Sequence, residues 1–366
     1  MEKLSVSFEG APCYTIVLDT SYGELGGYVE ALGFRGRRIG IITDSNVGPL
    51  YADAVATCFT DIASEVLICT IPAGEPNKNL TEIERLYEQL IEAHFDRHDL
   101  LVALGGGVVG DMTGFCAATY LRGIAFIQLP TTLLAQADSS IGGKTGVDFK
   151  GYKNMVGAFY MPRLVYMNLS VLNSLPAREF SSGFAEIMKH GLIKDQRFYM
   201  WLIDNMYEIQ ERDPETLTKM LKRSCEIKRA VVEADPKEQG ERALLNFGHT
   251  VGHAIEKYKD FTLLHGECVA LGCVAAAHIS AARNMIGADE YYEIRDMFVP
   301  FGLPITVEDV DTAEILRLVR SDKKADGRSI RFILLGKLGQ AVIRTDVTDD
   351  EIKAAVNEIL WREDGE

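Results

Sequence analysis

The chain has 366 residues, of which 47% are hydrophobic and 25% charged, and its formal net charge is −15. This length favours two domains, because a single hydrophobic core rarely grows beyond roughly 250–300 residues. Such an acidic surface repels phosphate backbones and anionic lipids, so we expect neither nucleic acid nor a membrane as a partner.

The sequence favours a cytoplasmic protein without a disulfide framework. Residues 1–7 show no basic stretch followed by an apolar one, so no signal peptide is expected. The longest apolar segment, around Cys268 to Ala277, is too short to span a bilayer. The seven cysteines are scattered without C-x-x-C spacing, which argues against disulfides and against a cysteine-based zinc site.

The first half of the chain alternates short apolar runs with stretches of helical pattern. The runs cover residues 15–18, 38–43, 66–71, 99–104 and 124–129. Their hydrophobicity is continuous, which is typical of strands covered on both faces in a parallel sheet. Residues 81–95 read as an amphipathic helix with a stripe of Ile83, Leu86, Leu90 and Ile91. We therefore predict a doubly wound, Rossmann-like α/β domain over residues 1–174, with ligands at the carboxyl ends of its strands.

A glycine-rich segment, Gly105 to Asp111, follows the fourth apolar run. It matches G-x-G-x-x-G between a strand and a helix, which is the context for a pyrophosphate on a helix N-terminus. Glycine suits this place because a Cβ would keep the backbone amides away from the phosphates. The segment comes late in the domain and lacks an acidic residue about 20 residues later. A plain tight turn therefore stays open as the alternative.

Polar residues follow three of the other predicted strands. Asp44 and Asn46 could bind ribose hydroxyls, and Glu75 and Lys78 offer a carboxylate for sugar hydroxyls and an ammonium for phosphate. The pair Thr131 and Thr132 follows the fifth run. Together they describe an extended nucleotide site, although loops and helix caps use the same residue types.

Residues 131–162 are rich in glycine and carry several lysines. Gly143-Lys144-Thr145 resembles part of a P-loop, but Asp138 stands where the first glycine of that motif belongs, so the match is weak. Lys144, Lys153 and the amide of Asn154 are expected on flexible loops near the nucleotide. The alternative is a glycine-rich linker with solvated lysines between two unlike domains.

From residue 175 to residue 366 the sequence predicts a mainly α-helical second domain. Helices are expected over residues 180–194, 214–232, 247–258, 266–283, 290–301 and 349–361, with a short hairpin over 330–343. Pro176 suits a first helical turn.

Three of the seven histidines fall in one window of this second domain. His249 and His253 are four residues apart and therefore lie on one face of a helix. His265 stands at the start of the next helical segment. Neutral imidazole is a common ligand of zinc, and small neighbouring residues allow two helices to approach closely. The alternative is a pair of helix-surface or core histidines, and a metal would need a further ligand from elsewhere.

Glu186 is the candidate for that ligand. Its neighbours Phe184, Ala185, Ile187 and Met188 are apolar, so a buried carboxylate at this position needs a cation as a partner. A metal shared with His249 and His265 would supply one. Lys189, one turn later, could serve the same site or simply form a salt bridge with Glu186.

The motifs, taken together, resemble those of 3-dehydroquinate synthase, a sugar phosphate cyclase family. The matching segments are Gly105–Asp111 with Thr113–Phe115, Tyr120–Gly123, Pro130–Ala135, Ser140–Gly146, Lys153-Asn154 with Gly157–Tyr160, Leu175–Glu179, Ala185-Glu186, Leu245–Glu256 and His265–Glu267. They occur in order over nearly the whole chain. Val251, Cys268 and Asp148 stand where members of the family often vary.

The resemblance implies a set of site residues. It implies zinc or cobalt on Glu186, His249 and His265. It implies NAD on Asp44, Asn46, Glu75, Lys78, Gly106, Gly107, Val108, Val109, Gly110, Asp111, Thr131, Thr132, Asp138, Lys144, Lys153, Val171, Leu172, Asn173 and Ser174. It implies the substrate among Arg122, Asp138, Lys144, Lys153, Asn154, Lys189, Lys228, Arg242, Asn246, His253, Lys323 and Lys324. In dimeric relatives the counterpart of Arg122 crosses the subunit interface, so a homodimer is also implied.

The implied activity is the NAD- and metal-dependent conversion of 3-deoxy-D-arabino-heptulosonate 7-phosphate to 3-dehydroquinate and phosphate, in the shikimate pathway of aromatic amino acid biosynthesis. A metal is expected to lower the pKa of a secondary hydroxyl so that hydride can pass to NAD. Three alternatives remain open: a cyclase of the 2-deoxy-scyllo-inosose synthase type, a metal-dependent polyol dehydrogenase, and a non-catalytic nucleotide-binding module. Lys144, Lys228 and Arg242 together favour a substrate that carries a carboxylate.

Overall fold

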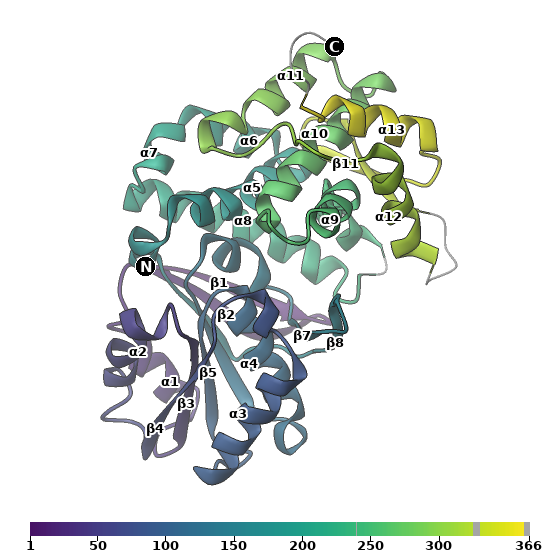
Figure 1. Cartoon of the computed structure of the whole chain (residues 1–366). Helices are drawn as coiled ribbons and strands as arrows, with labels where there is room; N and C mark the ends of the chain where they lie inside the picture. Colours follow the sequence, from purple (N-terminus) through teal and green to yellow (C-terminus); the bar gives the residue numbers. More distant parts are fainter. Residues whose placement is uncertain (239, 325–329, 362–366) are drawn as a thin grey trace. The chain divides into compact units, whose positions relative to one another are not determined.

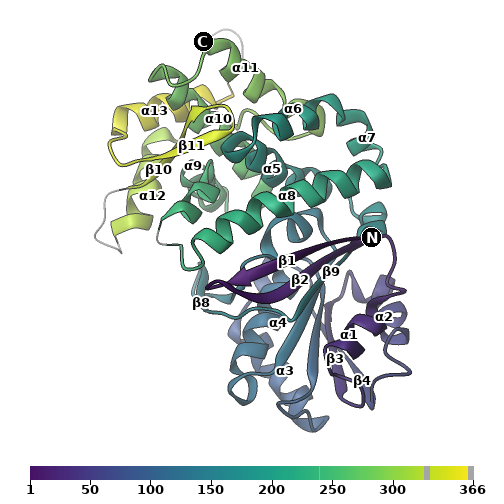
Figure 2. The ribbon, with the colours of Figure 1, turned by 180° about the vertical axis from the view of Figure 1, so that it is seen from behind.

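The computed structural model describes residues 1–238, 240–324 and 330–361 of the chain (Figures 1 and 2). The chain divides into two compact units. The first comprises Met1–Leu175 and Leu217–Arg229, and the second Pro176–Thr216 and Ala230–Glu366. The sequence predicts one boundary, between residues 174 and 175. In the structure, residues 217–229 of the long helix α8 (Pro214–Ala234) are grouped with the first unit, although the chain on either side of them belongs to the second.

A seven-stranded sheet forms the centre of the first unit. Its order is β1 (Glu2–Phe8), β2 (Ala11–Asp19), β9 (Leu164–Asn168), β6 (Ala125–Pro130), β5 (Leu100–Gly105), β3 (Arg38–Asp44) and β4 (Glu65–Ile71). The β1–β2 pair is antiparallel and every other pair is parallel. The carboxyl ends of β3, β4, β5, β6 and β9 therefore lie along one edge, where an open α/β sheet binds its ligands.

Helices cover both faces of this sheet (Figure 1). They are α1 (Leu25–Ala31), α2 (Gly48–Thr57), α3 (Leu80–Glu92) and α4 (Gly107–Thr119). Ile39 and Ile41 of β3 pack with α1 and α2 in one buried cluster, and Leu101 and Ala103 of β5 pack with α3 and α4 in another. Two cores on opposite faces explain the continuous hydrophobicity of the strands, and they confirm the doubly wound α/β fold.

The helix predicted over residues 81–95 is shorter than expected. It begins after Asn79, whose side chain accepts a hydrogen bond from the Glu82 amide at 3.1 Å, and it ends at Glu92. Ile91 was assigned wrongly to the buried stripe, because it is 61% exposed. Phe95, beyond the helix end, is buried in its place.

The glycine-rich middle of the chain is not a flexible loop. It forms an antiparallel hairpin of β7 (Lys144–Phe149) and β8 (Tyr152–Phe159), so Lys144, Lys153 and Asn154 lie on strands. Glycine at position 157 permits this pairing, because a Cβ there would lie 2.2 Å from the Thr145 carbonyl oxygen. The glycines that suggested a loop are required by the close approach of two strands.

Short helical segments complete the first unit. These are η1 (Glu75–Asn77), η2 (Tyr120–Arg122), the π-helical η3 (Ala135–Ser139) and η4 (Leu169–Ser174). Three of them, η1, η3 and η4, follow strands β4, β6 and β9 and carry several of the candidate nucleotide-binding residues.

The second unit is mainly helical, as predicted. Its helices are α5 (Ala177–Lys194), α6 (Gln196–Asp204), α7 (Met206–Gln210), the ends of α8 (Pro214–Ala234), η5 (Glu241–Asn246), α9 (His249–Tyr258), α10 (His265–Ala282), α11 (Ala288–Asp296), η6 (Val299–Phe301), α12 (Thr312–Lys324) and α13 (Asp349–Glu358). The predicted hairpin is β10 (Phe332–Lys337) with β11 (Gln340–Arg344). The helix expected over residues 290–301 is interrupted before Pro300, which cannot donate a helical hydrogen bond. In the described part of the chain, none of the helices has the length and apolarity that a bilayer crossing needs.

Glycines set the distance between α9 and α10. A Cβ at Gly272 of α10 would lie 1.8 Å from the Gly248 carbonyl oxygen and 2.9 Å from the Gly252 amide nitrogen. A Cβ at Gly252 would lie 2.6 Å from the Cys268 carbonyl oxygen. The two helices are therefore in backbone contact, as the small residues near the histidines suggested.

We expect Gly272→Ala to destabilise the second unit, because overpacking of a tight core costs about 1–3 kcal/mol. The thermal unfolding midpoint, followed by circular dichroism, should fall by several degrees. Gly27→Ala is the matched control, since a Cβ at this exposed position of α1 meets nothing within 4 Å. An unchanged midpoint for Gly272→Ala would show that α9 and α10 can separate freely.

Candidate active site

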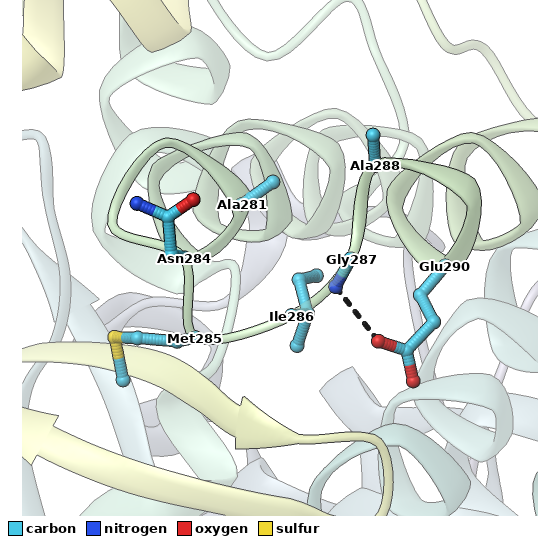
Figure 3. Close-up of a pocket in the computed structure, with 7 residues that line it drawn as sticks. All are labelled: Ala281, Asn284, Met285, Ile286, Gly287, Ala288 and Glu290. Atoms are coloured by element: carbon cyan, nitrogen blue, oxygen red, sulfur yellow. Dashed lines mark hydrogen bonds between the residues drawn. The ribbon is translucent and has the colours of Figure 1, made fainter.

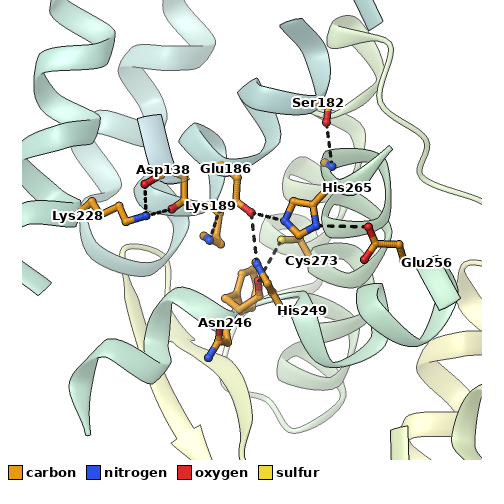
Figure 4. Close-up of polar contacts among 12 residues, drawn as sticks. Asp138, Ser182, Glu186, Lys189, Lys228, Asn246, His249, Glu256, His265 and Cys273 are labelled. Atoms are coloured by element: carbon orange, nitrogen blue, oxygen red, sulfur yellow. Dashed lines mark hydrogen bonds and ion pairs between the residues drawn. The ribbon is translucent and has the colours of Figure 1, made fainter. Parts of the chain in front are cut away.

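Two histidine side chains of the second unit converge on the buried carboxylate of Glu186 (Figure 4). Glu186 comes from the middle of α5, while His249 and His265 are the first residues of α9 and α10. The Glu186 Oε1 atom lies 3.4 Å from the Nε2 atom of each histidine. One ligand atom from each residue lies within 4.8 Å of the others, which is a spacing suited to a metal ion.

The backbone around His265 is fixed by neighbours on α5 and α10. The Gly266 amide donates to Ser182 Oγ at 3.0 Å, and a Cβ at Gly266 would lie 1.9 Å from the Ser182 carbonyl oxygen. Glu267 accepts from the Leu264 amide at 2.8 Å and from Arg178 at 2.7 Å through each carboxylate oxygen. These bonds hold the start of α10 in place, so His265 enters the cluster from a rigid helix end.

His249 enters the cluster through a glycine turn. Gly248, immediately before α9, has a φ of 80°, and a Cβ there would lie 2.8 Å from the Cys273 amide nitrogen of α10. The Nδ1 atom of His249 lies 3.1 Å from the Phe247 carbonyl oxygen. A carbonyl oxygen can only accept, so Nδ1 carries the hydrogen and Nε2 presents its lone pair toward Glu186.

The electrostatics of the cluster favour a cation. Burial by itself would raise the pKa of Glu186, but Lys189, followed by His249 and His265, holds that pKa well below its usual range. Burial and then Lys189 hold the pKa of His249 well below its usual value. Burial lowers the pKa of His265, but the carboxylates of Glu186 and Glu256 outweigh it and raise the pKa to about 9.

Glu186 provides the test of whether a metal fits. The residue is fully buried, and neither of its carboxylate oxygens has a hydrogen bond of regular geometry among the described residues. Lys189 forms an ion pair with Glu186 from the next turn of α5. A buried carboxylate that faces two imidazole nitrogens at 3.4 Å is a chemically suitable site for a divalent metal such as zinc.

In the first unit, the glycine segment after β5 forms a tight cradle. Gly106 is the N-cap of α4, so no capping side chain covers the first amides of the helix. A Cβ at Gly106 would lie 3.0 Å from Thr132 Cγ2, and one at Gly107 would lie 3.1 Å from Ser139 Oγ. A helix N-terminus of this kind can bind a pyrophosphate.

The remaining candidate nucleotide residues of the first unit follow parallel strands. Asp44 ends β3, the segment with Glu75 and Lys78 follows β4, the pair Thr131 and Thr132 follows β6, and Val171–Ser174 lies on η4 after β9. These strands end along the same edge of the sheet as β5. Asp44 also has a structural role, because its Oδ1 accepts from the Asn46 and Val47 amides at 2.8 and 2.9 Å.

Lys78 contacts residues of both the glycine segment after β5 and the β7–β8 hairpin. It is 4% exposed, and its ammonium lies 2.7 Å from Asp111 Oδ2 at the glycine loop and 2.5 Å from Asn154 Oδ1 on the hairpin. Burial lowers the pKa of Lys78, but Asp111 and Glu75 outweigh it and raise that pKa. Lys153 lies 3.8 Å from Glu75. Lys78 therefore connects the glycine segment with the hairpin.

The other candidate residues of the first unit are partly engaged. Lys228 on α8 is 5% exposed and lies 2.6 Å from Asp138 Oδ1 on η3. Lys144 is exposed at the start of β7. Arg122 is exposed at the end of η2, with a φ of 66°.

The second unit carries four further candidates for substrate contact. Lys189 is beside Glu186, and His253 is exposed on α9, with its ring centre 5.0 Å from that of His249. Arg242 is 3% exposed and donates to the Pro236 carbonyl oxygen at 2.7 Å. The Asn246 amide donates to Glu238 at 2.9 Å. The backbones of Lys323 and Lys324 end α12, and their side chains lie outside the described part of the structure.

Two carboxylates near the site were not anticipated. Glu238 holds Asn246, and Glu256 contacts the second ring nitrogen of His265. The spacing of His249 and Glu256, two turns apart on one helix, was a usable signal for the latter.

A surface hollow of about 430 Å³ lies elsewhere in the second unit, at the turn between α10 and α11 (Figure 3). Its lining includes Asn284, Met285 and Glu290, and Glu290 accepts from the Gly287 amide at 2.8 Å. It contains none of the predicted site residues.

Comparisons with known proteins agree with this description. Residues 68–182 match the family model for the 3-dehydroquinate synthase N-terminal domain, and residues 183–325 match that for the C-terminal domain. A 3-dehydroquinate synthase of Acetivibrio thermocellus is 44% identical over 96% of this chain and 97% of its own length. One of Symbiobacterium thermophilum is 46% identical over 87% of this chain and 89% of its own.

Solved structures with this fold include two cyclases. The 2-epi-5-epi-valiolone synthase ValA from Streptomyces hygroscopicus, with NAD⁺ and Zn²⁺ bound, has a TM-score of 0.88 and 26% identity over 97% of this chain and 99% of its own. A 2-deoxy-scyllo-inosose synthase with carbaglucose-6-phosphate, NAD⁺ and Co²⁺ has a TM-score of 0.87 and 26% identity over 98% of this chain and all of its own.

The fold and its two sites define an enzyme of the sugar phosphate cyclase class. Within that class, the chain belongs to the 3-dehydroquinate synthase family. The family expected from the sequence motifs is thus confirmed, and with it an enzyme that eliminates phosphate and closes a carbocycle.

We expect Glu186→Gln to lose bound zinc, because the change removes the only carboxylate of the three converging side chains. The zinc affinity, measured by competition with a chromogenic chelator, should fall by more than the 10–100-fold that loss of an outer-shell partner costs. Glu82→Gln is the control, since Glu82 is a buried carboxylate on α3 of the first unit. Retention of wild-type zinc affinity by Glu186→Gln would contradict the ligand assignment.

Proposed function

We propose that the protein converts 3-deoxy-D-arabino-heptulosonate 7-phosphate to 3-dehydroquinate and phosphate with NAD and a divalent metal, zinc or cobalt. The observation that carries this proposal is the cluster of buried Glu186 with half-buried His249 and His265, in a chain of the 3-dehydroquinate synthase family. The relatives that share 42–47% of its sequence have the name of that enzyme.

The two cofactors are assigned to residues of different units. The metal would bind to Glu186, His249 and His265, and the pyrophosphate of NAD to the amides at the start of α4. When bound, NAD accepts a hydride from a substrate hydroxyl and later returns it, while the metal lowers the pKa of that hydroxyl. Because the hydride returns, the overall reaction is not an oxidation.

The substrate carries a carboxylate and a phosphate, so its site needs several separate cations. We assign this role to Lys144, Lys153, Lys189, Lys228 and Arg242, together with one of Lys323 and Lys324. Arg242 and Lys228 are buried, which strengthens their interaction with an anion because little water screens them. These groups supply local positive charge in a chain whose net charge is −15.

Two side chains of the second unit are assigned to proton transfer and to orientation of the substrate. His253 lies one turn after His249 and is exposed, so it can exchange protons with water beside the metal ligands. Asn246, held by Glu238, offers an amide for orienting a sugar hydroxyl. Oxidation at one carbon makes the neighbouring C–H acidic, and phosphate leaves by β-elimination before the ring opens and recloses on carbon.

Two other activities remain as alternatives. A 2-deoxy-scyllo-inosose synthase acts with the same cofactors, but the two solved cyclases share only 26% identity with this chain. Glycerol dehydrogenases with 14–16% identity share the fold, and that likeness carries no statement on activity. A dehydrogenase would accumulate NADH, whereas a cyclase would not.

We expect purified protein with zinc and catalytic NAD to release inorganic phosphate from 3-deoxy-D-arabino-heptulosonate 7-phosphate. Absorbance at the NADH maximum should not rise during turnover, and a chelator should abolish phosphate release. Glucose 6-phosphate serves as the control substrate, because it lacks the carboxylate. Steady NADH accumulation, or phosphate release only from glucose 6-phosphate, would contradict the proposed reaction.

The protein is further proposed to act as a cytoplasmic homodimer. The β7–β8 hairpin exposes Phe149, Tyr152, Met155 and Phe159 by 40–61%, and among the described strands β8 pairs with β7 alone. Exposed apolar side chains on a two-stranded hairpin are typical of an interaction surface. The neighbouring η2 turn presents Arg122, which the family resemblance places across the dimer interface.

We expect Met155→Asp to weaken this dimer, because a charge would be buried on the apolar surface of the hairpin. Light scattering after size exclusion should show monomer at concentrations where the wild type is dimeric. Ile91→Asp is the matched control, since Ile91 is equally exposed at 61% on α3 of the same unit. A dimer that persists unchanged in Met155→Asp would exclude the hairpin as the interface.

A further inference from the structure

His265 has a carboxylate beside each of its two ring nitrogens (Figure 4). Its Nε2 atom lies 3.4 Å from Glu186 Oε1, and its Nδ1 atom lies 3.8 Å from Glu256 Oε1. Glu256 is 4% exposed and comes from α9, two turns after His249. One helix therefore supplies a metal ligand and a carboxylate that faces the other histidine.

The two histidines share one arrangement. In His249, Nδ1 faces the Phe247 carbonyl oxygen, and in His265, Nδ1 faces the Glu256 carboxylate. In both rings, Nε2 points at Glu186. An acceptor beside Nδ1 retains the hydrogen there, which leaves the Nε2 lone pair for a metal and makes it more basic.

We propose that Glu256 is a positioning residue of the metal centre: it holds the Nδ1 hydrogen of His265 and so fixes Nε2 as the ligand atom. This inference rests on the proposed function, because it requires a metal on Glu186, His249 and His265. Unlike the backbone carbonyl that serves His249, the Glu256 carboxylate carries a full negative charge, which favours a hydrogen on the facing ring nitrogen at 3.8 Å. Glu256 therefore tunes His265 in particular.

The surroundings of Glu256 leave two other roles to be tested. The first is a purely structural one, in which Glu256 only neutralises a buried imidazolium. The second is a second metal ion, because ligand atoms of His253, Glu256 and His265 also lie within 4.8 Å of one another. A second metal would require the Nδ1 lone pair of His265, and this is incompatible with a hydrogen held on that atom.

The test uses Glu256→Gln, which removes the charge but keeps the shape, and Glu256→Leu, which removes the acceptor. The control pair is Glu358→Gln and Glu358→Leu, because Glu358 Oε2 lies 4.0 Å from His278 Nδ1 in the same unit and away from the metal ligands. Zinc affinity is measured by chelator competition, and the visible absorption spectrum of the cobalt-loaded protein reports on the ligand field. Circular dichroism confirms folding of each variant.

We expect the zinc affinity to fall about tenfold in Glu256→Gln and about 100-fold in Glu256→Leu, the range known for loss of an outer-shell partner. The cobalt spectrum should shift in both variants and in neither Glu358 variant. Zinc affinities within twofold of wild type in both Glu256 variants, with an unchanged cobalt spectrum, would overturn the inference. Two zinc ions per wild-type chain, with only the weaker one lost in Glu256→Gln, would also overturn it.

These outcomes are distinguishable from failure of the proposed function. Wild-type protein that binds neither zinc nor cobalt would refute the metal assignment itself and the role of Glu256 with it. Wild-type protein that binds one zinc and releases phosphate, beside Glu256 variants of unchanged affinity, would refute only the role of Glu256. The Gln variant keeps the test informative if the Leu variant fails to fold.

Discussion

The arrangement of helices in the second unit depends on the burial of one carboxylate, that of Glu186, which is unfavourable unless a cation lies beside it. Glu186 is fully buried, its carboxylate forms an ion pair with the Lys189 ammonium, and two imidazole nitrogens face it at 3.4 Å. An isolated carboxylate in such a place would be protonated or would destabilise the fold. The arrangement of α5, α9 and α10 makes sense as a frame that holds a cation at this point.

That frame is rigid because its helices touch through their backbones. Gly266 rests on Ser182 of α5, and Gly272 rests on Gly248 at the start of α9. Both histidines stand at the first residue of a helix, where the chain direction is fixed by a cap or a glycine turn. Close packing of these helices thus fixes the positions of the two imidazoles and the Glu186 carboxylate, and a metal site requires such precision.

The features of the fold that depend on local pattern were predictable from the sequence. Continuous apolar runs gave β3, β4, β5 and β6 to within a residue or two, and the H-x3-H spacing located α9. The β7–β8 hairpin was missed because its glycines serve strand contact, which has no local signature that distinguishes it from a loop. Strand β9 was missed with it, since its five residues follow directly on this segment.

Pairings between distant residues could not be inferred from spacing. Lys78 and Asn154 are 76 positions apart, and Lys228 and Asp138 are 90 apart. Only the sheet order and the fold of η3 against α8 bring these side chains together. The family resemblance supplied the candidate residues as a set, and the structure shows which of them form ion pairs with each other.

The hydrogen bonds of the Lys78 ammonium constrain which amino-acid substitutions this enzyme can accept. The ammonium donates hydrogen bonds both to Asp111 of the glycine-rich segment and to Asn154 of the hairpin, and it is shielded from water. Substitution of Lys78 removes the donor that Asp111 and Asn154 share, whereas substitution of Asp111 or Asn154 removes one of the two acceptors of a buried ammonium, so we expect epistasis among the three positions. Libraries that vary the glycine-rich segment at position 111 would therefore be searched most productively with positions 78 and 154 varied alongside it.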